Sequence, residues 1–253
     1  MITNLQERAP AIFATSPSEH LSERYRFVST QEYLQAMESN GWLVASARQA
    51  KVRKGSPEHA KHFITLRHRD HGAARADLGS ITPQISFVNS HNGTSRVTFM
   101  LGLFRLVCSN GLIVQQGESY SQSFAHTRSA KEAADILTED FFRQADSIVQ
   151  TASDWADIAL TFDQQMQLAR TARDIRFGQD STVDPLDLLR ARRPADEGSN
   201  LWLTFNRLQE NIMQGGMRYN GMRRRSRPVS NIGHEVIYNT QLWKAADGIA
   251  ADF

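Results

Sequence analysis

The chain is poor in cysteine and has no long uncharged apolar run. Its 253 residues include one cysteine, Cys108. A single cysteine excludes an intrachain disulfide and a multi-cysteine zinc site, and it fits a reducing compartment. No stretch approaches the roughly 18 uncharged apolar residues that a membrane helix needs. The amino end carries Glu7 and Arg8 where a signal peptide has its apolar core. These absences predict a cytoplasmic protein with no membrane partner.

Motifs for nucleotide cofactors and metals are also missing. No GxGxxG occurs, and no glycine-rich loop ends in lysine followed by serine or threonine. The histidine-rich stretch 59–71 has neither the two-histidine motif of metalloproteases nor a cysteine–histidine finger. On a strand, His62 and His68 would share a face about 20 Å apart, which is too far to chelate one ion. We therefore expect no cofactor and no metal site.

The charge of the chain is small in total but unevenly distributed. The formal net charge is +2. Eight basic residues against three acids lie between positions 48 and 77, and five arginines with no acid lie between 217 and 230. Acids outnumber bases between 131 and 187. An acidic middle between two basic segments can steer an anionic polymer toward chosen faces of the protein.

The first half of the chain is predicted to contain a short helix and antiparallel β-hairpins. Ser29 or Thr30 is expected to cap the helix, and Asn40-Gly41 to end it. Asn92-Gly93 is typical of a two-residue turn between paired strands. Four strands are expected, at 42–54, 61–70, 81–90 and 94–101.

From about Ser129 the pattern changes to helices, so the fold class is predicted to be α+β with a mostly helical carboxyl-terminal half. Helices are expected at 129–160 (one or two), 163–177, 184–193, 200–214 and 240–250. Asp184 followed by Pro185 is a helix-start signal, and Gly178 and Gly215-Gly216 are helix-stop signals. Two regions follow: 1–125, a basic α+β region with β-hairpins, and 126–253, a mostly helical region with an arginine-rich segment at 218–228. The sequence leaves open whether they are separate domains.

Cys108, with His91 upstream, fits two hypotheses. A nucleophilic cysteine needs a base or a positive field, and a hairpin could bring His91 near it, as in a cysteine-dependent hydrolase. Cys108 also lies within the apolar run 103–114, a buried strand or short helix, and free cysteine is among the most buried residue types. We favour burial and expect no catalytic residue. Arg105, in the same run, then needs a carboxylate or a phosphate as its partner.

The helix expected at 200–214 has a dense polar set on an apolar background: Asn206, Arg207, Gln209, Glu210 and Asn211. Amide groups of this kind can recognise a base or another ligand. Structural roles, such as caps and a buried ion pair, are the favoured interpretation.

The two basic segments give the clearest functional signal. Arginine makes bidentate contacts to phosphate and stacks on bases. No helix-turn-helix stands out, which favours single strands over duplexes, and Phe63 and Trp42 are candidate stacking platforms. The alternative is that the cations are solvated or pair with the acidic helices. The expected nucleic-acid-binding residues are Lys51, Arg53, Lys54, Lys61, Arg67, Arg69, Arg96, Arg105, Arg223, Arg224, Arg225 and Arg227.

Several long stretches occur together in a recognisable order, among them AKHFITLRH, FVNSHNGTS, GLFRLVCSNGLIV, LWLTFNRLQENIMQGG and RRRSRPVSNI. The series resembles the YubP/YfjQ/YafZ-like family of plasmid and prophage proteins, a family of unknown function. The resemblance extends from about Arg8 to Trp243. It implies a role in mobile-element DNA maintenance, repair or defence evasion, and it supplies no catalytic residue.

The leading hypothesis is a non-enzymatic DNA-binding protein of mobile genetic elements that binds single-stranded DNA. Strand annealing is an extension of this hypothesis and would imply a homo-oligomer. One alternative is an interaction protein that blocks a host defence or repair protein, with its acidic helices mimicking nucleic acid. The other is the hydrolase that uses Cys108 and His91.

Overall fold

The computed structural model describes residues 5–22, 25, 27–52, 56–70, 76–106, 110–113, 121–123, 129–218 and 225–253. Its contacts divide the chain into two units. The sheet unit comprises Met1–Ala73, Thr82–Leu103 and Gln116–Ser147, and the helical unit comprises Ala74–Ile81, Phe104–Gln115 and Ile148–Phe253. This division differs from a single cut at residue 125, because short pieces of the expected β-region belong to the helical unit.

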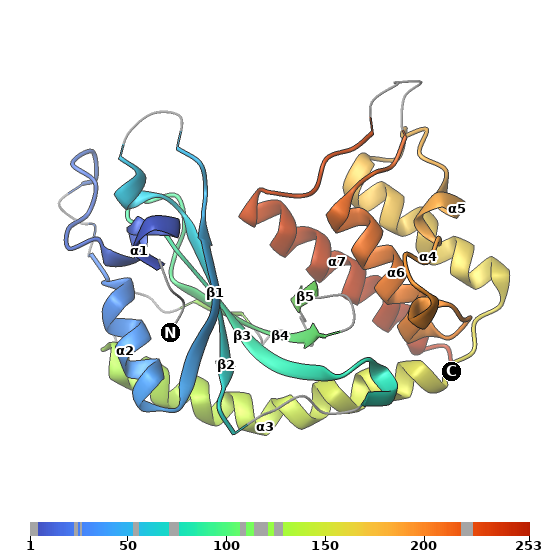
Figure 1. Ribbon diagram of the computed structural model, residues 1–253, viewed down its shortest axis with the longest axis horizontal. Helices are drawn as coiled ribbons and strands as arrows, with labels where there is room; N and C mark the ends of the chain where they lie inside the picture. The colour runs from blue at the N-terminus through green and yellow to red at the C-terminus, as the bar shows by residue number, and fades with distance from the viewer. Residues whose placement is uncertain are drawn as a thin grey trace. The chain divides into compact units, whose positions relative to one another are not determined.

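The strands lie in the order β1-β2-β3-β4-β5 (Figure 1). Off this path, β6 pairs with β4. Their bounds are β1 Trp42–Gln49, β2 His62–His68, β3 Ile81–Asn89, β4 Thr98–Arg105, β5 Asn110–Ile113 and β6 Ser121–Ser123. Antiparallel pairing joins β1 to β2, β2 to β3 and β4 to β6. The predicted α+β organisation, with antiparallel strands and a short helix before a mostly helical half, is confirmed.

The helices of the sheet unit cover aromatic side chains of the strands. They are α1 Leu5–Arg8, α2 Thr30–Ser39 and the first part of α3, Ala130–Asp157, with short 3-10 turns at Pro10–Phe13 and Pro57–His59. Ser29 caps α2 as predicted, since its side chain accepts from the Glu32 N–H. Tyr33 of α2 packs 5.9 Å from Phe87 and 5.7 Å from Phe99, measured between ring centroids. This cluster forms the core between α2 and strands β3 and β4.

Trp42 and Phe63, the candidate stacking platforms, are both buried. Trp42 packs edge-on against Phe141 of α3, with ring centroids 4.5 Å apart, and donates its indole N–H to Thr138. The guanidinium carbon of Arg48 lies 4.7 Å from the centroid of the Phe63 ring. The prediction that these rings stack on bases is therefore wrong: both serve packing in the sheet unit.

The helical unit is built around four aromatic side chains. Its helices are the end of α3, α4 Phe162–Phe177, α5 Pro185–Leu188, α6 Leu201–Gln214 and α7 Ile232–Ala250, with 3-10 turns at Ala76–Leu78 and Pro194–Asp196. Trp155 lies 4.3 Å from Trp243 and 5.3 Å from Phe205, and Phe205 lies 6.2 Å from Trp202. Figure 1 shows α4, α6 and α7 side by side, in agreement with their mutual contacts. In the part of the chain that the structure describes, no helix is both long and apolar enough to cross a bilayer.

The predicted two-residue hairpin at Asn92-Gly93 is wrong. β3 ends at Asn89 and β4 begins at Thr98, so the connection is the longer loop 90–97. Asn92 accepts from the Thr94 N–H and hydroxyl, and Gly93 adopts a φ of +74°, so a local turn does form. The connection is thus longer than two residues, and bonds from His91 within it and from Asn89 before it reach Thr30, at the start of α2.

Those bonds form a buried network around the hydroxyl of Thr30. This hydroxyl oxygen lies 2.8 Å from Nε2 of His62, 3.3 Å from Nε2 of His91 and 2.9 Å from the Asn89 amide nitrogen. His62 Nδ1 lies 2.9 Å from the Ala60 carbonyl and must donate to it. In neutral His62, Nε2 then accepts from Thr30, and Thr30 accepts from Asn89 and His91. All four side chains are buried.

Burial keeps both histidines neutral. Desolvation lowers the pKa of His62 to about 4, although its hydrogen bond to Ala60 opposes the shift. Desolvation likewise lowers the pKa of His91 to about 4, the neighbouring His62 acts in the same direction, and the Ala11 carbonyl opposes the shift. Both values lie below the ordinary 6.5, so the unfolded chain binds more protons than the folded one between about pH 6.5 and 4.

We therefore expect the free energy of unfolding to fall as the pH drops from 6.5 toward 4, by about 2 kcal/mol per histidine between pH 7.5 and 5. Urea denaturation at a series of pH values measures this loss. The His91→Leu variant should show a flatter pH profile, whereas His20→Ala, at an exposed position of the same unit, should keep the wild-type profile. Equal profiles for wild type and His91→Leu would contradict the prediction.

Candidate nucleic-acid interface

The arginine-rich segment begins as a hairpin at the end of α6. Gly215 ends the helix, Arg218 and Arg225 form an antiparallel bridge, and Ser226 exchanges backbone hydrogen bonds with Gly216 and Met217. We call residues 215–218 and 225–229 the arginine hairpin. Its two arms are fastened to the helix because the Val229 N–H donates to the Met213 carbonyl at 2.8 Å.

Gly215 allows the two arms to approach closely. Its φ is +69°, and a Cβ at this position would lie 2.7 Å from the carbonyl oxygens of both Ser226 and Arg227. Only glycine adopts this backbone conformation without strain and also leaves room for the facing chain. The helix end that was predicted from Gly215-Gly216 thus also sets the geometry of the hairpin.

One side of the arginine hairpin borders a pocket of about 540 Å³, which we call the Arg192 pocket. Arg192 donates from Nε to the side-chain oxygen of Asn211 at 2.8 Å and from Nη2 to the Gly215 carbonyl at 2.6 Å. Asn211 is buried, and its amide nitrogen donates to the carbonyls of Leu188 and Arg190. Arg192 is therefore held in place by neutral acceptors that leave its positive charge uncompensated.

The lining of the Arg192 pocket is strongly positive. Asp187 is its one acidic lining residue among those described, and it lies 3.9 Å from Arg190, where both side chains are well exposed and attract each other weakly. The lining arginines are Arg190, Arg192, Arg218 and Arg225. Within the described chain, the last three of these form no ion pair with a carboxylate.

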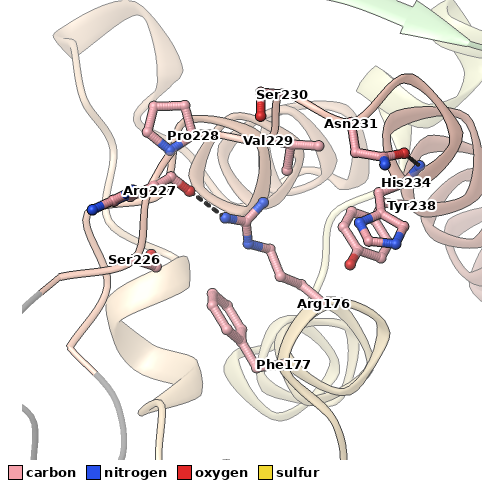
Figure 2. Close-up of a pocket in the computed structure, with 10 residues that line it drawn as sticks. All are labelled: Arg176, Phe177, Ser226, Arg227, Pro228, Val229, Ser230, Asn231, His234 and Tyr238. Atoms are coloured by element: carbon pink, nitrogen blue, oxygen red, sulfur yellow. Dashed lines mark hydrogen bonds between the residues drawn. The ribbon is translucent and has the colours of Figure 1, made fainter. Parts of the chain in front are cut away.

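The hairpin arm 226–229 also borders a second pocket of about 400 Å³, the Arg176 pocket. Figure 2 shows the Arg176 guanidinium reaching toward the Arg227 carbonyl, to which it donates a hydrogen bond. The rings of Phe177, His234 and Tyr238 complete the pocket, and none of its described lining residues is acidic. The pocket thus combines arginine with aromatic surface.

Arg105, one of the predicted nucleic-acid contacts, is internal. It is 2% exposed, and its Nη1 donates to Oδ1 of Asp196, which is 1% exposed. Its Nε donates to the Leu78 carbonyl at 3.0 Å. The prediction that Arg105 contacts nucleic acid is therefore wrong. Its partner is the Asp196 carboxylate, because a buried guanidinium must be paired to offset its desolvation.

The polar set on α6 also serves the interior. Glu210 pairs with Arg193, and Arg193 also donates to Oδ2 of Asp196 at 2.7 Å. Arg207 donates to the carbonyls of Asp196 and Gly198. The favoured structural interpretation, with a buried ion pair, agrees with this geometry.

The described cations of the sheet unit fall into separate groups. The predicted contact residues among them are the exposed Lys51, Arg69 and Arg96 and the half-buried Lys61 and Arg67. In the β1–β2 register, Lys51 and Lys61 stand at one end of the ladder and Arg67 and Arg69 near the other, about 20 Å away. Arg96 lies in the loop between β3 and β4. These five residues therefore do not form one continuous basic groove.

Arg225 and Arg227 are exposed on the arginine hairpin, as expected for contact residues. Four predicted contacts and the candidate nucleophile lie outside the described residues: Arg53, Lys54, Arg223, Arg224 and Cys108. His91, the candidate base, is 0% exposed and faces Thr30. Among the described residues, no group of three or more histidine, cysteine or acidic side chains is arranged to hold a metal ion.

Several pocket residues were missed by the sequence reasoning. The helix predicted at 184–193 includes Arg190 and Arg192, but α5 ends at Leu188. Pro194 indicates that the helix ends before it, because the residue before a proline avoids the helical conformation. For Arg176, the sequence offered only its place in an amphipathic helix.

A family model described as a domain of unknown function, DUF932, matches residues 17–243. The chain belongs to this family. It is 31% identical over 251 residues to the UPF0380 protein YafZ of Escherichia coli strain K12, which covers 95% of this chain and 88% of that protein. It is 30% identical over 249 residues to the UPF0380 protein YfjQ of the same strain, with 94% and 87% covered. No solved structure matches the chain. The predicted resemblance is confirmed.

In this family member, Arg105→Met should lower the free energy of unfolding by about 3–5 kcal/mol, because Asp196 would remain buried without one of its two arginines. Denaturant titration measures the change. Arg143→Met provides the matched control, since Arg143 is exposed on α3 and its ion pairs contribute less than about 1 kcal/mol. Similar losses for the two variants would contradict the assignment of Arg105 to a buried pair.

Gly215→Ala should destabilise the protein by more than about 1 kcal/mol, because the added methyl meets the facing backbone and the left-handed conformation disfavours alanine. Gly248→Ala is the control, since a Cβ there meets nothing within 4 Å and alanine favours the helix by roughly 0.5–1 kcal/mol. In thermal unfolding, Gly215→Ala should lower the midpoint temperature and Gly248→Ala should raise it. A neutral Gly215→Ala would show that the arms of the hairpin are not closely packed.

Proposed function

We propose that the protein binds single-stranded DNA through the arginine hairpin and the two pockets that flank it. The observation that carries this proposal is that the arginines of the helical unit fall into two groups, one paired with buried carboxylates and one gathered at a pocket. Arg105 and Arg193 are paired with internal carboxylates. Arg192, Arg218 and Arg225 surround one pocket with no carboxylate partner among the described residues.

Gathering like charges is unfavourable unless an anion offsets it, because unit charges repel one another across a pocket of this size. A phosphodiester backbone supplies regularly spaced anions, and guanidinium groups bind phosphate through two parallel hydrogen bonds. Arg192 is already positioned by Asn211 and Gly215, so little side-chain entropy is lost when it binds an anion.

The single-stranded form is favoured by the surface next to the cations. The Arg176 pocket presents aromatic rings beside arginine, a combination typical of proteins that track a backbone and stack on unpaired bases. DNA, as opposed to RNA, is favoured by the plasmid and prophage setting that the family resemblance implies. Lys51, Lys61 and Arg96 of the sheet unit are candidates for further backbone contacts.

Fluorescence anisotropy of a labelled oligonucleotide across a salt series tests the proposal. Wild type should bind at low salt, with an affinity that falls as salt rises. The triple variant Arg192→Ala, Arg218→Ala, Arg225→Ala should bind at least about 10-fold more weakly. Its log–log salt slope should be smaller by about 2, since each lost contact to a single strand removes about 0.7.

A triple control with the same loss of charge separates a local site from general electrostatic attraction. Arg143→Ala, Arg170→Ala and Lys244→Ala remove three exposed cations outside both pockets. This control should keep most of the affinity and most of the slope. No binding by wild type at low salt, or equal losses in the two triple variants, would overturn the proposal.

A further inference from the structure

We infer that the Arg176 pocket is a subsite for one unpaired nucleotide, with a phosphate at Arg176 and a base against His234 and Tyr238. This inference rests on the proposed function and adds to it the means by which single strands are distinguished from duplexes. The pocket's volume of about 400 Å³ lies within the range of small-ligand sites.

The stacking surface is formed by two rings on one face of α7. His234 and Tyr238 are four residues apart, so they lie on the same side of the helix. Their ring centroids are 5.5 Å apart and their planes differ by 27°. His234 is exposed and Tyr238 half-buried, so the outer ring is open to a flat ligand and the inner ring supports it. A nucleobase is the part of a nucleic acid that such a surface accommodates.

The anion-binding side of the pocket comes from α4 and the hairpin arm. The Arg176 guanidinium carbon lies 5.2 Å from the centroid of the Phe177 ring, and Arg176 also donates to the Arg227 carbonyl. Phe177 and the hairpin arm thus orient the guanidinium, and Figure 2 shows it between Phe177 and the His234–Tyr238 pair. Arg227 adds a further exposed cation at the rim.

The start of α7 adds to the positive potential of the pocket. Asn231 caps the helix by accepting from the His234 N–H, and the positive end of a helix of 19 residues attracts anions. Ser230 and the amide nitrogen of Asn231 form no hydrogen bond with any described residue, so both can donate to the edge of a base. The pocket therefore provides a cation, a stacking surface and hydrogen-bond donors within the space of one nucleotide.

Such a subsite accepts a base only when it is unpaired, because a base inside a duplex is stacked on both faces and hydrogen-bonded along its pairing edge. Stacking on an aromatic side chain is sequence-tolerant, since every base has a π-face. The class of ligand is thus single-stranded DNA of any sequence. The hairpin and the Arg192 pocket, by contrast, bind the backbone that both forms of DNA share.

An oligonucleotide with one 2-aminopurine tests this assignment. Stacking quenches 2-aminopurine fluorescence, so binding to wild type should reduce the emission. The double variant His234→Ala, Tyr238→Leu should lose the quenching and bind single strands about 5- to 30-fold more weakly. Its duplex affinity and its salt slope should match those of wild type, because no arginine or lysine is removed.

Two further variants keep the result interpretable. Tyr238→Phe retains the ring and should retain the quenching. Phe162→Leu removes an exposed aromatic side chain outside the pocket and should behave as wild type. Circular dichroism and thermal unfolding establish that each variant is folded.

Quenching and single-strand preference that survive in a folded His234→Ala, Tyr238→Leu variant would overturn the nucleotide subsite. If the arginine triple variant of the previous section still weakened binding in that case, the proposed function would stand without the subsite. A wild-type protein that binds no oligonucleotide at low salt would instead remove both.

Discussion

The buried ion pair between Arg105 and Asp196 is the interaction on which the helical unit depends. Asp196 accepts from Arg105 on one carboxylate oxygen and from Arg193 on the other, so both oxygens are satisfied without water. Gly79, with a φ of +87°, leaves the space that Arg105 fills, since a Cβ there would lie 2.6 Å from its Nε. Removing these charges from water is costly, and only this nearly complete set of hydrogen bonds offsets the cost.

The same network determines which arginines of the helical unit are paired with internal carboxylates. Glu210 of α6 pairs with Arg193, and the next residue, Asn211, positions Arg192 in the adjacent pocket. One turn of helix therefore carries both a carboxylate used inside the protein and an amide that directs a cation outward. Because Asp196 and Glu210 are engaged internally, neither compensates the arginines of the hairpin. The positive charge of the pocket follows from how the interior uses its acids.

Short sequence patterns predicted helix caps and helix ends correctly. For contacts between distant residues, they predicted the type of partner but not its identity. The cap at Asp184 with Pro185 and the helix ends at Gly178 and Gly215 depend on neighbouring residues, and all are confirmed. The need of Arg105 for an anionic partner was also predictable from its apolar surroundings. That the partner is Asp196, 91 residues away, was not, because no local pattern encodes such pairing. At Asn92-Gly93 the local turn forms, but the two-residue hairpin is wrong because the flanking strands end at Asn89 and begin at Thr98.

The position of Arg105 also bears on where the chain can be divided. A cut at residue 125 looks natural from the change in secondary structure, yet it would separate Arg105 from Asp196. In a fragment that starts at residue 126, the Asp196 carboxylate would keep its hydrogen bond from Arg193 but lose the one from Arg105. Trp202 would also lose the Leu78 carbonyl, which accepts its indole N–H. The contact boundary between Leu103 and Phe104 avoids this, since it assigns the end of β4 to the helical unit. The helical unit that carries the arginine hairpin therefore includes residues from both halves of the sequence.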